Sequence, residues 1–151
     1  MRRDSETSDP FDLARFVAAQ EADYTRALFE IKAGRKRTHW MWYIFPQFDG
    51  LGFSSISKFY AIKSRAEAEA YLRHPILGSR LLECVTALLQ LDGRFAHDIF
   101  GSPDDLKLRS CATLFATVNN DSKNGSIFHR LLTKYYPAQG PDPNTLRLLA
   151  M

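Results

Sequence analysis

The chain has 151 residues, of which 45% are hydrophobic and 25% are charged, and its formal net charge is +3. These values are ordinary for one soluble globular domain with a substantial core. So small a charge does not by itself argue for nucleic acid, which we do not expect as a partner. The lack of an apolar run of 18 residues predicts no membrane-spanning helix.

The first ten residues have no apolar segment after their two arginines, so we expect a disordered lead-in rather than a secretory signal. A helix is predicted over residues 13–33, where apolar side chains recur with the spacing of one helical face. Gln20 falls on the same face. Gly34 is placed to end this helix in a left-handed conformation.

The next segment is short and rich in aromatic residues. Thr38 can cap a helix over residues 39–45, which Pro46 then stops. A buried strand over residues 40–45 is the alternative, because periodicity does not separate short apolar runs. Residues 49–52, with the sequence D-G-L-G, are predicted to form a turn.

Two serines mark the helices that follow. Ser54 or the adjacent Ser55 can cap a segment over residues 56–62. Ser64 and Glu67 have the spacing of a capping box, which predicts the start of another helix.

Three later helices are predicted from the residues that can start them. Pro75, after His74, is placed at the first position of one helix, and Ser102, before two aspartates, can cap the next. Ser126 can cap a third helix after a polar loop over residues 119–125. A last short helix follows a turn over residues 137–143. Cys84 and Cys111 lie in apolar helical patterns without a C-x-x-C pair. We therefore expect buried free thiols in a cytoplasmic protein.

No stretch alternates apolar and polar residues over the length of a half-buried strand. No repeat or linker divides the chain either. The sequence therefore predicts an all-α fold, with a single compact domain of six to eight helices over residues 11–151.

Residues 35–57 have the most distinctive composition in the chain. They combine three cations, a histidine, two tryptophans, a glutamine and two glycines. Large aromatic side chains dominate the energetics of cores and binding sites alike, and polar residues among them need partners when buried. Residues 39–54 therefore form either part of the core or the wall of a pocket.

Several short motifs occur together, namely F-V-A-A-Q at 16–20, H-W-M-W-Y-I-F-P-Q at 39–47, G-L-G at 50–52, H-P-I-L-G at 74–78, I-F-G at 99–101 and K-L-R-S at 107–110. They resemble the bacterial domain-of-unknown-function family 1810 (DUF1810), whose members are sometimes mislabelled calpastatin. The resemblance extends from about residue 12 to residue 149. It implies a mainly α-helical fold of this length, and it implies no activity, cofactor or catalytic residue.

The three cations at residues 35–37 precede His39 in the first turn of the predicted short helix. Helix N-termini attract anions through free N–H groups, so Arg35, Arg37 and His39 are candidates for binding a phosphate or a carboxylate. The alternative is a solvated connection between helices, with His39 as a hydrogen-bonded packing residue.

Trp40 and Trp42 have two possible roles. They can stack on a nucleobase or a nicotinamide ring, or they can anchor the core, which we favour. Gln47 can read a base edge or hold a backbone turn, and the sequence does not separate these roles.

Two further polar features are weaker signals. The doublet of His97 and Asp98 resembles part of a metal-dependent phosphohydrolase site, in which His39 or His74 and Asp121 would supply the remaining ligands. Such a doublet arises easily by chance, so no metal site is predicted. Arg109 can belong to an exposed polar cluster or can pair with a buried carboxylate such as Glu30.

Three functional interpretations remain, and the sequence leaves open both the cofactor and whether the protein is an enzyme. In the first, a small anionic metabolite, such as a nucleotide or an ADP-ribose-like compound, is bound or processed by Arg35, Arg37, His39, Trp40, Trp42, Gln47, Gly52 and Ser54. The second is a protein-interaction or regulatory module without catalysis. The third is weak nucleic-acid binding through residues 35–37.

Overall fold

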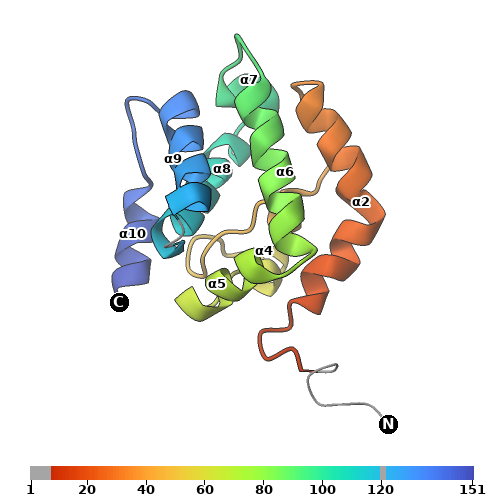
Figure 1. Ribbon diagram of the computed structural model, residues 1–151, viewed down its shortest axis with the longest axis vertical. Coiled ribbons are helices and arrows are strands. Elements are labelled where there is room, and N and C mark those ends of the chain that lie inside the picture. Colours follow the sequence, from red (N-terminus) through yellow and green to blue (C-terminus); the bar gives the residue numbers. More distant parts are fainter. Residues whose placement is uncertain (1–7, 120–121) are drawn as a thin grey trace.

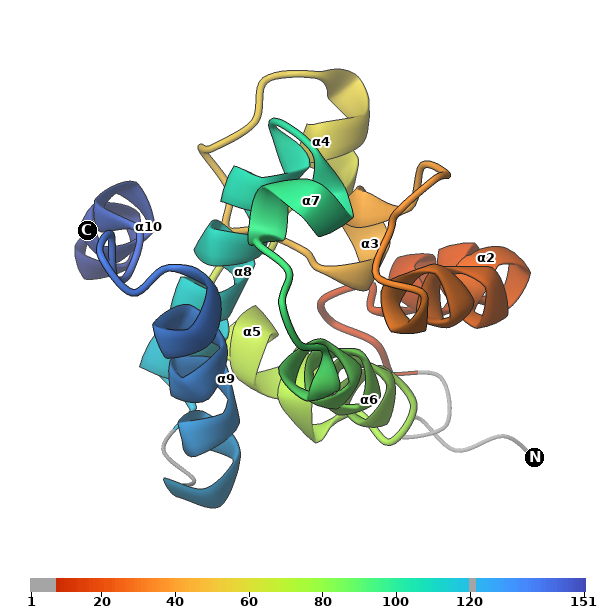
Figure 2. The same ribbon diagram turned by 90° about the horizontal axis from the view of Figure 1, so that it is seen from above.

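The computed structural model describes residues 8–119 and 122–151 (Figures 1 and 2). Within these ranges it contains nine helices and no β-strand, apart from one parallel bridge between Phe48 and Ile62. The predicted all-α class is confirmed. Six of these helices have eight residues or more. Of the predicted disordered lead-in over residues 1–10, residues 1–7 lie outside the described residues.

The helices, in chain order, are α2 (Ala14–Lys32), α3 (Met41–Ile44), α4 (Ser55–Tyr60), α5 (Arg65–Arg73), α6 (Leu77–Gln90), α7 (Ala96–Phe100), α8 (Asp104–Val118), α9 (Ser122–Tyr135) and α10 (Pro143–Ala150). Helix α2 packs along α6, which also contacts α5 and α9. Helix α8 contacts α5, α7, α9 and α10. Figure 2 shows α2 and α10 at opposite edges of the molecule, with α8 between them.

Aromatic side chains connect four helices through the core. The Phe16 ring meets Tyr71 edge-on at 5.1 Å between centroids, Tyr71 lies 5.5 Å from Phe115, and Phe115 lies 5.7 Å from Phe128. Gln20 is buried beside them, and its Nε2 donates to the Tyr71 hydroxyl at 3.1 Å. The placement of Gln20 on the buried face of α2 is thus confirmed, and its amide has the partner that burial requires.

Gly34 ends α2 as predicted. Its φ is +78°, in the left-handed region that glycine adopts without a Cβ penalty. The amide of Gly34 donates to Ile31 O at 2.9 Å, and the amide of Arg35 donates to Glu30 O at 3.0 Å. This pair of bonds is the Schellman motif, and it turns the chain from α2 into residues 35–40.

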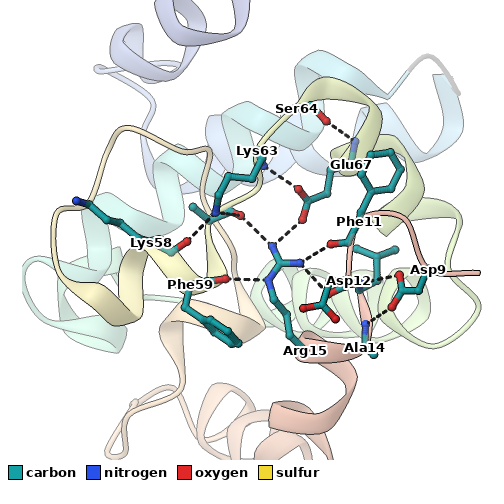
Figure 3. Close-up of polar contacts among 12 residues, drawn as sticks. Asp9, Phe11, Asp12, Ala14, Arg15, Lys58, Phe59, Lys63, Ser64 and Glu67 are labelled. Carbon is teal, nitrogen blue, oxygen red and sulfur yellow. Dashed lines mark hydrogen bonds and ion pairs between the residues drawn. The ribbon is translucent and has the colours of Figure 1, made fainter.

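Arg15 joins the start of α2 to two later segments, as Figure 3 shows. Its guanidinium donates to Glu67 Oε2 at 2.7 Å on α5 and to four carbonyl oxygens, those of Phe11, Asp12, Phe59 and Ala61. Arginine has five N–H donors, so these five bonds use its full capacity. The Arg15 and Glu67 side chains are only 8% and 2% exposed, which makes this a buried, fully hydrogen-bonded ion pair.

Gly78, in the H-P-I-L-G motif, allows α5 and α6 to approach closely. A Cβ atom at this position would lie 2.1 Å from the carbonyl oxygen of Leu72. No side chain fits at that distance. The glycine of this motif therefore has a packing role.

The predicted start of the short aromatic helix is wrong, although its helical character is confirmed over the strand alternative. Helix α3 begins at Met41, and its N-cap residue Trp40 makes no side-chain cap bond. The Thr38 hydroxyl instead donates to Glu30 Oε2 at 2.8 Å. The hydrogen bond that an ionised carboxylate accepts is stronger than one between neutral groups, so Glu30 holds this hydroxyl.

Proline 75 does not occupy the first position of α6, as the sequence predicted, because that helix begins at Leu77. The His74 ring explains the later start. Its Nδ1 accepts from the amides of Ile76 at 3.1 Å and Leu77 at 3.2 Å. A ring nitrogen thus satisfies N–H groups that lack partners within the helix.

Two other predicted starts are also wrong. Helix α8 has Pro103 as its N-cap residue, without a side-chain cap, so Ser102 is not the cap. Helix α9 begins at Ser122, which places Ser126 inside it, and residues 120–121 of the predicted loop lie outside the described residues. By contrast, Ser54 caps α4 and Ser64 caps α5 through the amides three residues later.

Candidate functional site

The carboxylate of Glu30 fixes the chain that follows α2. It accepts hydrogen bonds from Arg37 N at 2.9 Å, Thr38 N at 3.1 Å, Thr38 Oγ1 at 2.8 Å and Trp40 Nε1 at 2.9 Å. Burial by itself would raise the pKa of Glu30, but these four donors outweigh it and lower the pKa to about 2. The ionised side chain therefore holds residues 35–40 in place.

The predicted site residues before α3 separate into exposed and buried groups. The Arg35, Arg37 and His39 side chains are exposed. Trp40 is fully buried, and its ring contacts Phe45 and Phe100 at centroid distances of 6.2 and 6.3 Å. Trp40 is thus a core anchor, as the favoured interpretation held, and it does not line any pocket described below.

Two lysines supply the cations that lie closest to the tryptophan rings. Lys36 Nζ is 5.1 Å from the Trp40 ring centroid, and Lys107 Nζ is 5.5 Å from that of Trp42. Both ammonium groups also reach Asp104, at 2.9 and 3.6 Å. These contacts join residues 36–42 to the first turn of α8, where the predicted first-turn carboxylates are confirmed.

Three of the predicted site residues line one small hollow. Trp42, Gln47 and Gly52 surround it together with Phe48, Ser57, Tyr60 and Ala61. Its volume is about 10 Å³, which is room for about one water molecule. A Cβ at Gly52 would lie 2.6 Å from the Cβ of Ser57, so close packing accounts for the glycine. The remaining predicted residue, Ser54, is exposed and caps α4.

The His97–Asp98 doublet lies in the short helix α7. Asp98 Oδ2 accepts from the amide of Phe95 at 2.8 Å, and His97 Nδ1 lies 3.5 Å from Asp105 Oδ2. The described residues contain no group of three or more histidine, cysteine, aspartate or glutamate side chains arranged to hold a metal ion. Asp121 lies outside the described residues.

Cys84 and Cys111 are buried free thiols, as predicted. Burial raises the pKa of Cys84 to about 12 and raises that of Cys111 well above its usual range. The thiolate is the nucleophilic form of cysteine. Neither side chain is therefore suited to nucleophilic catalysis.

A much larger cleft lies between α8, α9 and the segment that leads into α10. Its volume is about 370 Å³, and most of its wall is apolar. The lining residues are Thr113, Ala116, Thr117, His129, Leu132, Thr133, Tyr136, Pro137, Gly140, Pro141 and Leu146. We call this site the cleft.

The cleft exists because small side chains face α9 from α8. Thr113, Ala116 and Thr117 have the spacing that places three residues on one helical face. The Thr117 hydroxyl donates to Thr113 O at 2.7 Å. A hydroxyl oxygen has two lone pairs, so Thr117 can still accept a hydrogen bond from a ligand.

The wall formed by residues 137–142 is held firmly against α8. Arg109 donates to the carbonyl oxygens of Gln139, Gly140 and Pro141 at 2.8–3.0 Å. The alternative in which Arg109 pairs with Glu30 is therefore wrong, since backbone acceptors occupy this guanidinium and Glu30 has its own donors.

Asp142 completes this attachment. Its amide donates to Thr113 Oγ1 at 2.8 Å, and its Oδ2 accepts from Ser110 Oγ at 3.0 Å and from Thr145 Oγ1 at 2.6 Å. Burial would raise the pKa of Asp142, but these hydrogen bonds lower it. Hydrogen bonds thus attach residues 139–142 to α8, while most of the surface that faces the cleft is apolar.

The cleft was not predicted from the sequence. Its residues are ordinary helix and turn residues, separated by up to 33 positions, and none belongs to a catalytic motif. One signal was present, since Thr113, Ala116 and Thr117 interrupt the large apolar residues of α8. That α9 leaves this face partly uncovered depends on tertiary packing.

Comparisons with known proteins agree with the fold. The model of a family described as "Protein of unknown function (DUF1810)" matches residues 10–149. The chain is also similar to a solved structure, the conserved hypothetical protein Rv1873 from Mycobacterium tuberculosis, with 50% sequence identity and a TM-score of 0.90. That match covers 95% of this chain and 99% of the other. A comparison with curated proteins gives no match. Among the described residues, no helix is both long and apolar enough to cross a membrane.

Proposed function

This chain belongs to the DUF1810 family of proteins of unknown function, and from its own residues we propose that the cleft binds a small, mainly apolar molecule. The observation that carries the proposal is the volume of about 370 Å³ enclosed by α8, α9 and residues 137–146. Ligand sites are typically clefts of about 300–1,000 Å³ with mostly apolar walls. An apolar cavity of only about 150 Å³ already binds benzene.

The attachment of residues 137–142 to α8 also supports the proposal. Arg109 and Asp142 hold this wall through side chain–backbone hydrogen bonds. A preformed wall lowers the entropy lost when a ligand binds. The polar groups within reach of a ligand are few, and Thr117 and Thr133 are among them, so a ligand with one or two hydrogen-bonding groups fits best.

The test is a titration with 1-octanol, followed by ¹H–¹⁵N correlation spectra. We expect shift changes concentrated at Thr113, Ala116, Thr117 and residues 132–146, and a higher apparent melting temperature, because a ligand of the native state stabilises it. Ala116→Phe should fill the cleft and weaken octanol binding at least tenfold. Ala22→Phe, an exposed position on α2, is the matched control and should bind octanol as the wild type does.

Two results would contradict the proposal. One is the absence of binding by the wild type, and the other is unchanged affinity in a folded Ala116→Phe protein. Leu146→Gln serves as a second variant in case the phenylalanine prevents folding. Leu146 is partly exposed at the rim, so the change is tolerated structurally and should still weaken octanol binding several-fold.

A second candidate function is the binding of a small anionic metabolite by residues 39–54, as the sequence suggested. One observation favours it, namely that Trp42, Gln47 and Gly52 line one hollow, and the Lys107 ammonium group lies 5.5 Å from the centroid of the Trp42 ring. Since this hollow holds about one water, binding there requires α4 to move away from Trp42. The same titration with ADP as the probe tests it, since shift changes must then appear at Trp42 and Gln47.

A further inference from the structure

A second hollow lies next to the cleft on the other side of α9. It has a volume of about 380 Å³ and is lined by Leu89, His129, Arg130, Thr133 and Lys134. We call it the cationic hollow. His129 and Thr133 line both the cleft and the cationic hollow, so the two sites meet along these side chains.

Helix geometry makes the two sites continuous. Residues four apart lie in one row along a helix surface, and α9 together with Tyr136, which follows it, presents three adjacent rows. In order from the cleft to the cationic hollow, these rows are Leu132 with Tyr136, then His129 with Thr133, then Arg130 with Lys134. An elongated molecule can therefore lie partly in the cleft and cross one row to reach the cations.

The two sites differ in charge. The cleft has a mostly apolar wall, whereas the cationic hollow has the Arg130 guanidinium and the Lys134 ammonium in its lining. None of the described residues that line the two sites is an aspartate or a glutamate. Lys134 Nζ donates to Leu89 O at 2.7 Å and also to Leu91 O, so this ammonium group is held in position at the end of α6.

We propose that the natural ligand is an amphipathic carboxylate, with its hydrocarbon part in the cleft and its head group on Arg130. This inference rests on the proposed function and names its ligand class. Arg130 is exposed, and its planar fork matches the two oxygens of a carboxylate. Lys134 adds a fixed positive charge one turn away.

The test compares octanoate with 1-octanol, which has the same chain length and no charge, by isothermal titration at low ionic strength. We expect octanoate to bind the wild type about tenfold more tightly than octanol. Arg130→Gln should remove this preference while leaving octanol affinity unchanged. Arg73→Gln, an exposed arginine at the end of α5, is the matched control and should keep the preference.

The outcomes separate the two proposals. If octanol binds but octanoate binds no more tightly, or if the preference survives Arg130→Gln, the carboxylate inference is overturned and the proposed function stands. If neither probe binds, both are overturned. Ala116→Phe should weaken both probes, and octanoate binding of wild-type strength in that folded variant would place the probe on the surface cations and overturn the inference.

Discussion

At the residue scale, Glu30 shows how one side chain decides the structure of a neighbouring segment. The run at residues 35–37 has the composition of a solvated connection or an anion site. Its backbone conformation is set by the buried Glu30 carboxylate, which binds Arg37 N, Thr38 and Trp40. A carboxylate in an apolar environment is stabilised only if several donors surround it, and here four do.

Replacing Glu30 with glutamine should lower the free energy of unfolding by about 3 kcal/mol at pH 7, because the pKa of about 2 lies well below the ordinary value of 4.5. The stabilisation is complete above pH 4.5 and is lost as the pH falls from 4.5 towards 2. The difference between wild type and Glu30→Gln in urea unfolding should therefore shrink over that window.

The control for this prediction is Glu69→Gln, a partly exposed carboxylate on α5. It should change the free energy of unfolding by less than about 0.5 kcal/mol. A difference between wild type and Glu30→Gln that stayed constant from pH 7 to pH 2 would show that the ionised carboxylate is not the stabilising form.

At the element scale, the molecule depends on a few side chains that tie helices to distant loops. Arg15 joins α2 to α5, to the last turn of α4 and to Ala61, which follows α4 (Figure 3). Arg109 and Asp142 do the same for α8 and the start of α10. A short helix such as α4 gains little stability from its own hydrogen bonds, so the Arg15 bonds to Phe59 O and Ala61 O help to determine where α4 lies.

Arg15→Met should destabilise the protein by about 3–5 kcal/mol, because it leaves the buried Glu67 carboxylate without its cation. Chemical denaturation provides the measurement. The double variant Arg15→Met with Glu67→Gln should recover part of the loss, since the unpaired charge is then absent. Strictly additive losses in this cycle would mean that the two side chains are not coupled.

At the scale of the whole molecule, the buried residues of α2, α5, α6, α8, α9 and α10 belong to one hydrophobic core. The aromatic chain from Phe16 to Phe128 runs through it. We therefore propose that residues 11–151 form a single domain, as the sequence suggested, since the buried hydrophobic residues that the structure describes do not divide into separate cores.

A single domain of this size should unfold in one cooperative transition. Tryptophan fluorescence reports on Trp40 and Trp42 alone, whereas far-UV circular dichroism reports on all helices. The two signals should give the same midpoint and the same m-value in urea. Separate midpoints would indicate that α8 to α10 unfold independently of α2 and α3, and would contradict the single-domain proposal.

The sequence by itself determined the helical class, the position of α2, the Gly34 terminus and the serine caps of α4 and α5. These features depend on residues within a few positions of one another, where propensity and local hydrogen bonding decide the outcome. It also carried the motifs of the family, and it correctly placed Gln20 on the buried face of α2 and both cysteines in the interior.

Tertiary structure decided the rest. The sequence suggested that Thr38 caps a helix, but its hydroxyl binds the Glu30 carboxylate. It also allowed Arg109 to pair with Glu30, but folding brings the carbonyl oxygens of residues 139–141 to this guanidinium instead. The cleft arises in the same way. Small residues on α8 line a cleft only because α9 and residues 137–146 leave space above them, and a gap between packed elements has no signature in any one segment of the chain.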